Sequence, residues 1–509
     1  MKKFTAKSTV TFILILGILI SIPSFKAKAL AQNETRATWI ATVFNIDWPK
    51  TENLKQELSE DLDLLQKTGI NTVYFQVRSM GDALYPTNYA PWSSYLTGTL
   101  GKDPGYDPLA YAISESKKRN LQLQAWFNPF RISTSSAFNK NDYLSKLPAN
   151  NKLKNNPDWI VSYGNYSMIN PGIPSARAYV IETIMDVVNR YDIAGVHLDD
   201  YFYPYSGTEF IDSKEYALYN KGMTVEDWRR DNVNSFVKDL NVAIKSSKKD
   251  VKFGISPFGI WKNSTSEGGS NTNGTQSYYS TYSDSVKWVK NNWVDYIVPQ
   301  VYWSIGDSVA DFDRIVKWWN EVVRGTNVNL IIGQAGYKVG TKFSSSDEII
   351  NQIKMMRTLD NVKGHSIFSF SQIKEDTLGL RSKLDNLYNQ NWKLIDNKWY
   401  FSNPSTGENY KGWLLDRGTW YYLDLNTGAM NTGWILYNDN WYHLEDSGRM
   451  SIGWVLHNNN WYYMSPSGAM KTGWIYTGGK WYYCYSNGNM AANTRIGGYR
   501  LGSNGAWIK

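Results

Sequence analysis

The sequence predicts an α/β protein in two parts, a (β/α)8 TIM barrel followed by an all-β solenoid of stacked hairpins. The barrel is indicated by eight alternations of a short β-branched run with a longer amphipathic segment, between about residues 38 and 388. The solenoid is indicated by a motif that returns every 20–21 residues from Trp392 to Lys509. With an amino-terminal export signal, we expect three regions: 1–31, 35–390 and 391–509.

The first 31 residues have the pattern of a signal peptide. Basic residues precede an apolar run over Val10–Ile20, and small residues follow it as Ala27-Lys28-Ala29 or Ala29-Leu30-Ala31. We expect cleavage after Ala29 or Ala31, with an uncleaved anchor as the alternative. No other stretch of 18 apolar residues occurs, so we expect a secreted chain with no membrane span after processing.

The alternating region supplies eight candidate strands and eight candidate helices. The strands are expected at Thr38–Phe44, Thr72–Val77, Leu121–Phe127, Gly195–Asp199, Lys252–Ser256, Tyr296–Val301, Asn329–Ile332 and Ser366–Phe370. The helices are expected at Leu54–Lys67, Pro108–Arg119, Ala176–Tyr191, Thr224–Ser246, Tyr282–Asn291, Val309–Val323, Ser346–Leu359 and Thr377–Tyr388. An open doubly wound sheet is the alternative, but no Gly-x-Gly-x-x-Gly follows the first strand. The barrel is therefore the better prediction.

Composition excludes several functions. The chain has a formal net charge of +8, and removal of residues 1–31 with their five lysines leaves about +3, which argues against a nucleic-acid partner. A single cysteine, Cys484, excludes an internal disulfide, and four dispersed histidines argue against a metal site, so we expect no metal and no cofactor. The unusual feature is aromatic content, with 23 Trp and 36 Tyr.

In a barrel of this class the chemistry lies at the carboxyl ends of the strands. At these ends the sequence places Asn45, Asp47 and Trp48; Gln76, Arg78 and Asp82; Trp126 and Asn128; His197, Asp199, Asp200 and Tyr201; Gln300, Tyr302, Trp303 and Asp307. Aromatic faces together with carboxylates, amides and a guanidinium are how proteins bind sugars, because flat ring faces stack and hydroxyls accept and donate hydrogen bonds. We therefore predict a saccharide site.

Hydrolysis of a glycosidic bond usually needs two carboxyl groups. Neighbours on a strand point to opposite faces, so Asp199 and Asp200 are not expected to form the pair by themselves. We expect one of them, Asp199 first, to act as nucleophile or base, and Asp47, Asp82 or Asp307 to supply the partner acid. The remaining polar residues would orient hydroxyls and the aromatic ones would stack on rings. Structural roles are the alternative, above all for His197 and Arg78.

Several motifs then resemble one family in order. They are Arg36–Val43 with Asn45–Pro49, Phe75–Arg78, Gly81–Pro86, Ala90–Ser93, Ala125–Pro129, Asn170–Gly172, Gly195–Pro204, Trp228–Asn232, Ile255–Gly259 and Pro299–Trp303. Together they resemble the glycosyl-hydrolase-like family ten over about residues 36–385. This resemblance implies a glycosidase-type barrel with bacterial cell-wall glycan as its substrate class. The sequence departs from the family at Ser79-Met80.

The carboxyl-terminal region repeats two dipeptides, Gly-Trp and Trp-Tyr, and closes its units with Gly-x-Met. Each unit is too small to bury its own face, so neighbouring hairpins must stack. The repeats resemble choline-binding cell-wall repeats, in which aromatic cages hold quaternary ammonium groups by cation–π attraction. The matching positions are Trp413, Trp420, Tyr422, Trp434, Trp441, Trp454, Trp461, Tyr463, Trp474, Trp481 and Tyr483, with His443 in place of a tyrosine in one unit. Saccharide is the alternative ligand of such hairpins.

Two function classes remain. The first is a secreted glycosidase that acts on peptidoglycan-type wall glycan and is held on the wall by its repeats. The second is a non-catalytic wall or carbohydrate-binding protein on a degenerate barrel. The carboxylates at the strand ends favour the enzyme.

Overall fold

The computed structural model describes residues 34–205, 210–389, 392–402, 408–416 and 419–508. The expected signal peptide, residues 1–31, lies outside the described residues. Within the described ranges, none of the helices combines the length and the apolar character that a membrane crossing requires.

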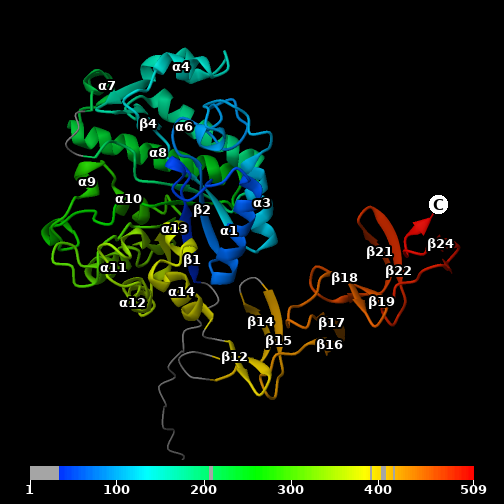
Figure 1. Ribbon diagram of the computed structural model, residues 1–509. Helices are drawn as coiled ribbons and strands as arrows, with labels where there is room; N and C mark the ends of the chain where they lie inside the picture. Colours follow the sequence, from blue (N-terminus) through cyan, green and yellow to red (C-terminus); the bar gives the residue numbers. More distant parts are fainter. Residues whose placement is uncertain (1–33, 206–209, 390–391, 403–407, 417–418, 509) are drawn as a thin grey trace, which may run out of the picture.

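Eight parallel strands close into a barrel, which confirms the expected fold class (Figure 1). Around the barrel the strands are β1 (Thr35–Ile40), β2 (Thr72–Arg78), β3 (Gln122–Phe127), β7 (Gly195–Leu198), β8 (Lys252–Ile255), β9 (Tyr296–Ile297), β10 (Asn329–Ala335) and β11 (Val362–Phe368). The helices that follow these strands in turn are α1 (Leu54–Thr68), α3 (Pro108–Lys118), α6 (Pro174–Arg190), α8 (Val225–Ser247), α10 (Ser285–Lys290), α11 (Phe312–Val322), α12 (Asp347–Met356) and α14 (Leu380–Asn389).

Two strands differ from their expected bounds for identifiable reasons. The first strand ends at Ile40 instead of Phe44, because the backbone N–H groups of Thr42 and Val43 donate to the side chain of Gln76 and leave the ladder. The strand β9 ends at Ile297 instead of Val301, and Pro299, which has no N–H to donate, follows directly.

The long loops carry elements that the sequence pattern did not reveal. A three-stranded antiparallel sheet in the order β4-β6-β5 is inserted between β3 and α6. Its strands are Arg131–Ser133, Tyr166–Ile169 and Ile160–Tyr163. The additional short helices are α2 (Ser94–Thr97), α4 (Lys140–Ser145), α5 (Lys152–Asn155), α7 (Ser213–Tyr219), α9 (Ser277–Ser280) and α13 (Phe370–Lys374). Several of these elements are only four or five residues long, which is too short for a clear periodicity.

The inside of the barrel is packed with aromatic rings. Trp39, Tyr74, Trp126 and Tyr296 form one buried cluster there, separate from the larger core between the strands and the helices. The ring of Tyr296 fits because β8 has Gly254 beside it, where a Cβ atom would come within 2.2 Å of that ring.

His197 joins these rings by hydrogen bonds. Trp39 Nε1 donates to His197 Nε2 at 3.0 Å, so the neutral imidazole must carry its proton on Nδ1. Nδ1 lies 3.1 Å from the hydroxyl of Tyr296, which donates to Gln124 Oε1 at 2.5 Å. Burial lowers the pKa of His197 to about 3, so this ring is neutral at physiological pH.

The repeats form a row of antiparallel hairpins (Figure 1, yellow to red). Their strands are β12 (Trp392–Ile395) with β13 (Lys398–Phe401), β14 (Gly412–Asp416) with β15 (Thr419–Leu423), β16 (Gly433–Tyr437) with β17 (Asn440–Leu444), β18 (Gly453–His457) with β19 (Asn460–Met464) and β20 (Met470–Lys471), β21 (Gly473–Thr477) with β22 (Lys480–Cys484), and β23 (Arg495–Ile496) with β24 (Tyr499–Leu501) and β25 (Trp507–Ile508). Two-residue turns such as Asn458-Asn459 and Gly478-Gly479 have positive φ at both positions, which suits the twist of a tight hairpin.

The Gly-x-Met pattern fixes the stacking of successive units. A Cβ atom added to Gly448 would lie only 2.2 Å from the sulfur of Met430. A Cβ atom added to Gly468 would meet the sulfur of Met450 at the same distance. A side chain at Gly448 or Gly468 would displace the methionine of the preceding unit, and the positive φ of both residues also favours glycine.

We predict that His197 makes the barrel sensitive to acid. Its pKa is about 3 in the folded chain and about 6.5 in an unfolded one, so the unfolded state binds the proton first as the pH falls. The stability that this difference contributes is complete above about pH 6.5 and is lost progressively toward pH 3. Thermal unfolding of His197→Gln should show a smaller drop in Tm between pH 7 and pH 4.5 than the parent shows. An equal drop in both proteins would contradict this prediction.

Candidate active site and aromatic cages

Asp199 lies at the carboxyl end of β7, on the same inward face as His197. Three donors surround its half-buried carboxyl group: Asn128 Nδ2 at 3.0 Å from Oδ2, and on Oδ1 the backbone N–H of Asp200 at 2.9 Å and Gln300 Nε2 at 3.3 Å. Donors on both oxygens suit an ionised carboxylate, which can only accept hydrogen bonds. The site thus contains one carboxylate held in a fixed orientation at the mouth of the barrel.

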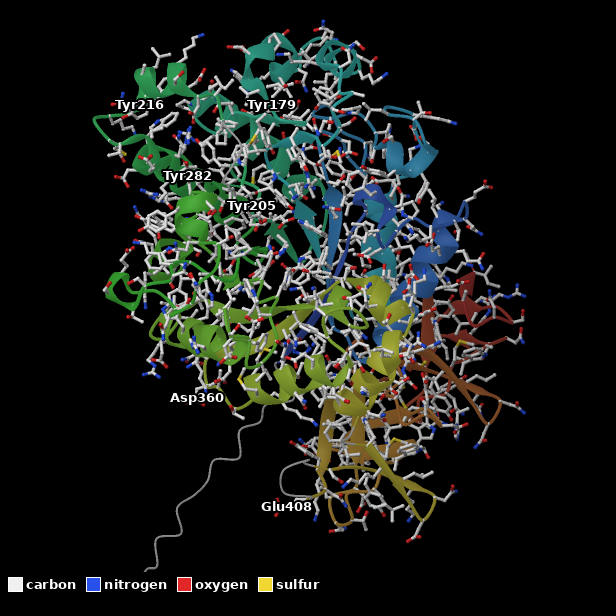
Figure 2. The ribbon with its side chains drawn as sticks, turned by 60° about the vertical axis from the view of Figure 1, so that its left-hand side comes forward. Tyr179, Tyr205, Tyr216, Tyr282, Asp360 and Glu408 are labelled. Carbon is white, nitrogen blue, oxygen red and sulfur yellow. The ribbon has the colours of Figure 1, made fainter. Side chains whose placement is uncertain are left out.

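Asp200 follows it and is almost completely buried. The Tyr205 hydroxyl donates to Asp200 Oδ2 at 2.5 Å (Figure 2, where Tyr205 is labelled). Burial raises the pKa of Asp200 well above its usual range, and the neighbouring charge of Asp199 raises it further. Of the two adjacent carboxyl groups, Asp200 is therefore the one whose surroundings favour the protonated form.

Aromatic rings line the surroundings of this pair. Burial raises the pKa of Tyr302, and the charge of Asp199 adds to the effect. The Tyr302 ring stacks with Phe368 at 6.3 Å between centroids, and Trp303 packs edge-on against Phe258 at 5.7 Å. On the other side the guanidinium of Arg131 covers the Tyr201 ring at 4.8 Å. Tyr201, Tyr302 and Trp303 are partly exposed.

The three expected partner acids make their hydrogen bonds within loops. Asp47 is buried and accepts from Ala41 N, Ser369 Oγ, and both the backbone and the hydroxyl of Ser371, so it joins the β1 and β11 loops. Asp82 accepts from the Met80 backbone within its own loop. Asp307 accepts from Val309 N and Ala310 N and closes a surface turn. Each of the three carboxylates is thus occupied in shaping a loop.

Four side chains that were expected to bind sugar also make contacts within the protein. Trp48 is completely buried in the core outside the barrel, and Asn45 donates to the backbone of Pro49 and Tyr95. Trp126 belongs to the buried cluster inside the barrel. Arg78 is buried beside the hydroxyl of Tyr143. Direct contact of these side chains with a sugar stays a prediction, because strand-end position does not by itself determine which way a side chain points once loops fold over it.

Gln76, Asn128 and His197 are likewise fully enclosed. Of these three, only Asn128 touches the carboxylate of Asp199, and Gln76 in turn donates to Asn128. Tyr205 was missed by the sequence reasoning, although it directly follows the motif Gly195–Pro204 and continues its run of tyrosines.

In the repeats, aromatic cages form at the junctions between hairpins. In the first cage Trp413 meets Trp420 of its own hairpin at 6.2 Å and Tyr442 of the next hairpin at 4.8 Å. The two following cages repeat this geometry as Trp434, Trp441 and Tyr462, and as Trp454, Trp461 and Tyr482. Each cage therefore needs two hairpins.

The third ring of each cage differs from the expected one. Tyr422 is buried against Trp413 and Tyr437, and Tyr463 and Tyr483 pack at 5.0 and 5.4 Å on the tryptophans of their own hairpins. Tyr422 therefore belongs to the interior of the stack, whereas Tyr463 and Tyr483 are half-buried, and a role of the three in choline binding stays a prediction. His443 occupies the position that corresponds to these tyrosines, 5.3 Å from His457, so the cage of Trp434 keeps its three rings.

A fourth cage closes the described end of the chain. Trp474, Trp481, Tyr499 and Trp507 line a cavity of about 370 Å³. Tyr499 lies 5.5 Å from Trp474 and 5.6 Å from Trp507. Tyr499 and Trp507 were missed because the last unit has neither the Gly-Trp nor the Trp-Tyr dipeptide of the others. Among the residues that the structure describes, no group of three or more His, Cys, Asp or Glu side chains is arranged to hold a metal ion.

The barrel with its carboxyl pair, followed by caged aromatic hairpins, defines a glycosyl hydrolase-like protein with a wall-binding tail. The chain belongs to the family described as glycosyl hydrolase-like 10, whose model matches residues 34–349. A choline-binding repeat model matches residues 390–432, and a putative cell wall binding repeat matches residues 432–450, 452–470 and 472–490. The repeats associate the chain with the cell wall.

Two relatives are named as glycosyl hydrolases. The chain is 46% identical over 400 residues to glycosyl hydrolase YngK of Bacillus subtilis, covering 75% of this chain and 77% of that protein. It is 39% identical over 324 residues to glycosyl hydrolase DigH of Escherichia coli K12, covering 60% of this chain and 74% of that protein.

Solved structures resemble each part. Choline binding protein F of Streptococcus pneumoniae, solved in the presence of a peptidoglycan analogue, is 44% identical over 23% of this chain and 40% of that one, with a TM-score of 0.23. The glycoside hydrolase domain of PgaB (BpsB) from Bordetella bronchiseptica is 12% identical over 68% of this chain and 98% of that one, with a TM-score of 0.44.

Proposed function

We propose that the protein is a secreted glycoside hydrolase that acts on peptidoglycan-type cell-wall glycan and is retained on choline-bearing wall polymers by its repeats. The observation that carries the proposal is the pair at the mouth of the barrel, in which Asp199 accepts from three donors and the pKa of Asp200 is raised. Family membership and relatives named as glycosyl hydrolases support the reaction class.

The chemistry follows from the two protonation states. Cleavage of a glycosidic bond needs a proton for the leaving oxygen and a carboxylate that attacks the anomeric carbon or activates water. Asp199 provides the carboxylate, fixed by Asn128 and Gln300. Burial and the charge of Asp199 both disfavour the ionisation of Asp200 and raise its pKa, which suits a group that supplies a proton. Tyr201, Tyr302 and Trp303 offer ring faces on which sugar units can stack.

The partner acid thus differs from our first expectation, which sought it on another strand. Asp47, Asp82 and Asp307 each shape a loop, whereas Asp200 combines contact with Asp199 and a raised pKa. We propose Asp199 as nucleophile or base and Asp200 as the acid that gives its proton to the leaving oxygen when the glycosidic bond breaks.

Retention follows from the cages. A quaternary ammonium group is attracted to the faces of several rings at once, at about 0.5–2 kcal/mol for each favourable contact. Four such cages in one described tail would each bind weakly, and the simultaneous occupation of several would hold the enzyme on a polymer that carries many cholines.

The catalytic proposal predicts the effect of removing either carboxylate. Asp199→Asn and Asp200→Asn should each fold and bind the wall as the parent does, and at least one should lose about 10²-fold or more in turnover. The assay is release of reducing ends from purified wall glycan, with Asp158→Asn, an exposed carboxylate, as matched control. If the double variant hydrolyses glycan at the parent rate, β7 does not carry the reaction. Wall binding without any hydrolysis by the parent would favour the non-catalytic alternative.

The retention proposal predicts which tyrosine matters. Tyr462→Ala should reduce the number of choline sites seen in titration calorimetry by one, because the second cage loses the ring that closes it. Leu425→Ala, an exposed apolar residue of the tail, is the control and should leave the number of sites unchanged. If the parent ignores choline and binds wall saccharide instead, the saccharide alternative replaces this proposal.

A further inference from the structure

A line of side-chain amides connects the loop after β1 to the carboxylate of Asp199. It begins at Gln76 on β2, whose Oε1 accepts the backbone N–H groups of Thr42 and Val43, each at 2.9 Å. Both donors belong to the main chain and cannot be turned into acceptors. The amide of Gln76 is therefore forced to present its oxygen to β1 and its nitrogen to the opposite side.

This orientation determines the next one. Gln76 Nε2 donates to Asn128 Oδ1 at 2.7 Å, at the end of β3. With its oxygen committed, Asn128 must direct Nδ2 away from Gln76, and Nδ2 donates to Asp199 Oδ2 at 3.0 Å. The backbone N–H groups of Thr42 and Val43 therefore fix the orientation of Gln76, and Gln76 fixes that of Asn128. As a result, a donor and not an acceptor faces the carboxylate of Asp199.

Burial leaves the amides of Gln76 and Asn128 only one orientation. Gln76 and Asn128 are both 0% exposed, so no solvent can replace a lost partner. Turning either amide over would set an N–H against an N–H, or an oxygen against the carboxylate of Asp199, inside the barrel. Gln300, the other amide on Asp199, also donates to the backbone of Ser256, and it has no contact with Gln76.

We propose that Gln76 is a positioning residue that acts through Asn128, setting the polarity of the amide line so that Asp199 always meets a donor. The proposal deepens the function inferred above and rests on Asp199 as the reacting carboxylate. Gln76 was expected to bind sugar directly, but its enclosure assigns it to the orientation of the carboxylate. The titratable groups around Asp199 are Asp200, Tyr201, Tyr205 and Tyr302. None of them contacts Gln76 among the described residues.

The test is Gln76→Glu in the full chain. The new carboxylate can keep both backbone donors of Thr42 and Val43, but when ionised it needs a donor from Asn128 as well. Asn128 must then turn its Nδ2 toward the new carboxylate and its Oδ1 toward Asp199. The charged form of Asp199 loses a donor and gains a facing acceptor, and a second negative charge lies nearby.

The measurement is the carbon-13 signal of the Asp199 carboxyl group, recorded against pH in protein labelled at aspartate and assigned with Asp199→Asn. We expect the titration midpoint of this signal to rise by about one pH unit or more in Gln76→Glu. Gln334→Glu is the matched control, because Gln334 is equally buried in β10 but donates to Gln352 and Ile349. In Gln334→Glu the titration midpoint of Asp199 should stay within about 0.3 pH units of the parent value. This difference is well below the shift that a change of hydrogen-bond partner at Asp199 would cause.

The carboxyl group introduced at position 76 is followed in the same way, because in its protonated form its O–H would still donate to Asn128 and leave the amide line unchanged. An unchanged Asp199 midpoint while that group is ionised, or the same shift in both variants, overturns the proposal. If that group stays protonated, the Asn128→Asp variant described below decides. This readout does not require catalysis, so it separates the amide line from the proposed function. If the parent protein releases no reducing ends from wall glycan, the proposed function is refuted. If the Asp199 midpoint does not shift, the proposed role of Gln76 is refuted. If Gln76→Glu does not fold, Asn128→Asp replaces it: the second oxygen then faces Asp199 across the 3.0 Å contact and should raise the midpoint by like charge, and no shift would again overturn the proposal.

Discussion

Closure of eight parallel strands into a barrel is the constraint on which the rest of this structure depends. Closure directs every second residue of each strand into one shared interior, so polar side chains from different strands must satisfy one another there. The contacts of His197 with Trp39 and Tyr296 are one result. The amides that lead from the loop after β1 to Asp199 are another. A carboxylate at the end of such an interior is held before any ligand arrives, and this pre-organisation is what catalysis by positioned charge requires.

The tail obeys a different constraint. A hairpin of two five-residue strands cannot bury its own aromatic face, so each unit depends on its neighbour. Methionine of one unit fills the space over glycine of the next, and this contact sets the spacing at which Trp413 meets Tyr442. A cage is therefore a property of a junction and not of a repeat. At the end of the row, Tyr499 and Trp507 supply the missing rings from a hairpin of different sequence.

The carboxyl pair of the barrel and the aromatic cages of the tail differ in physical character. The barrel holds the half-buried Asp199 among three donors and the buried Asp200 beside it, where burial and the charge of Asp199 raise the pKa of Asp200. The cages include exposed tryptophans such as Trp420, Trp441 and Trp461, and under the proposed function each cage offers a modest attraction that becomes strong only in number. Under the proposed function this arrangement suits an enzyme on a polymer: weak individual contacts can release and re-form while the chain stays near its substrate, and the rigid site does not need large binding energy of its own.

The sequence by itself determined the architecture. The eightfold alternation predicted all eight barrel strands and their following helices, and the 20–21-residue period predicted the row of hairpins, because both signals come from local periodicity repeated many times. It also located Asp199, since strand-end position in a barrel is readable from the chain. Only the tertiary structure decided which other side chains surround that residue. Asp47 and Trp48 stand at a strand end but are drawn into loop and core contacts, and Tyr205 and Asn128 reach the carboxyl pair. Tyr442, not Tyr422, closes a cage because the ring comes from the adjacent hairpin. Such choices depend on packing between segments distant in sequence, and no local pattern records which way a side chain will turn when those segments meet.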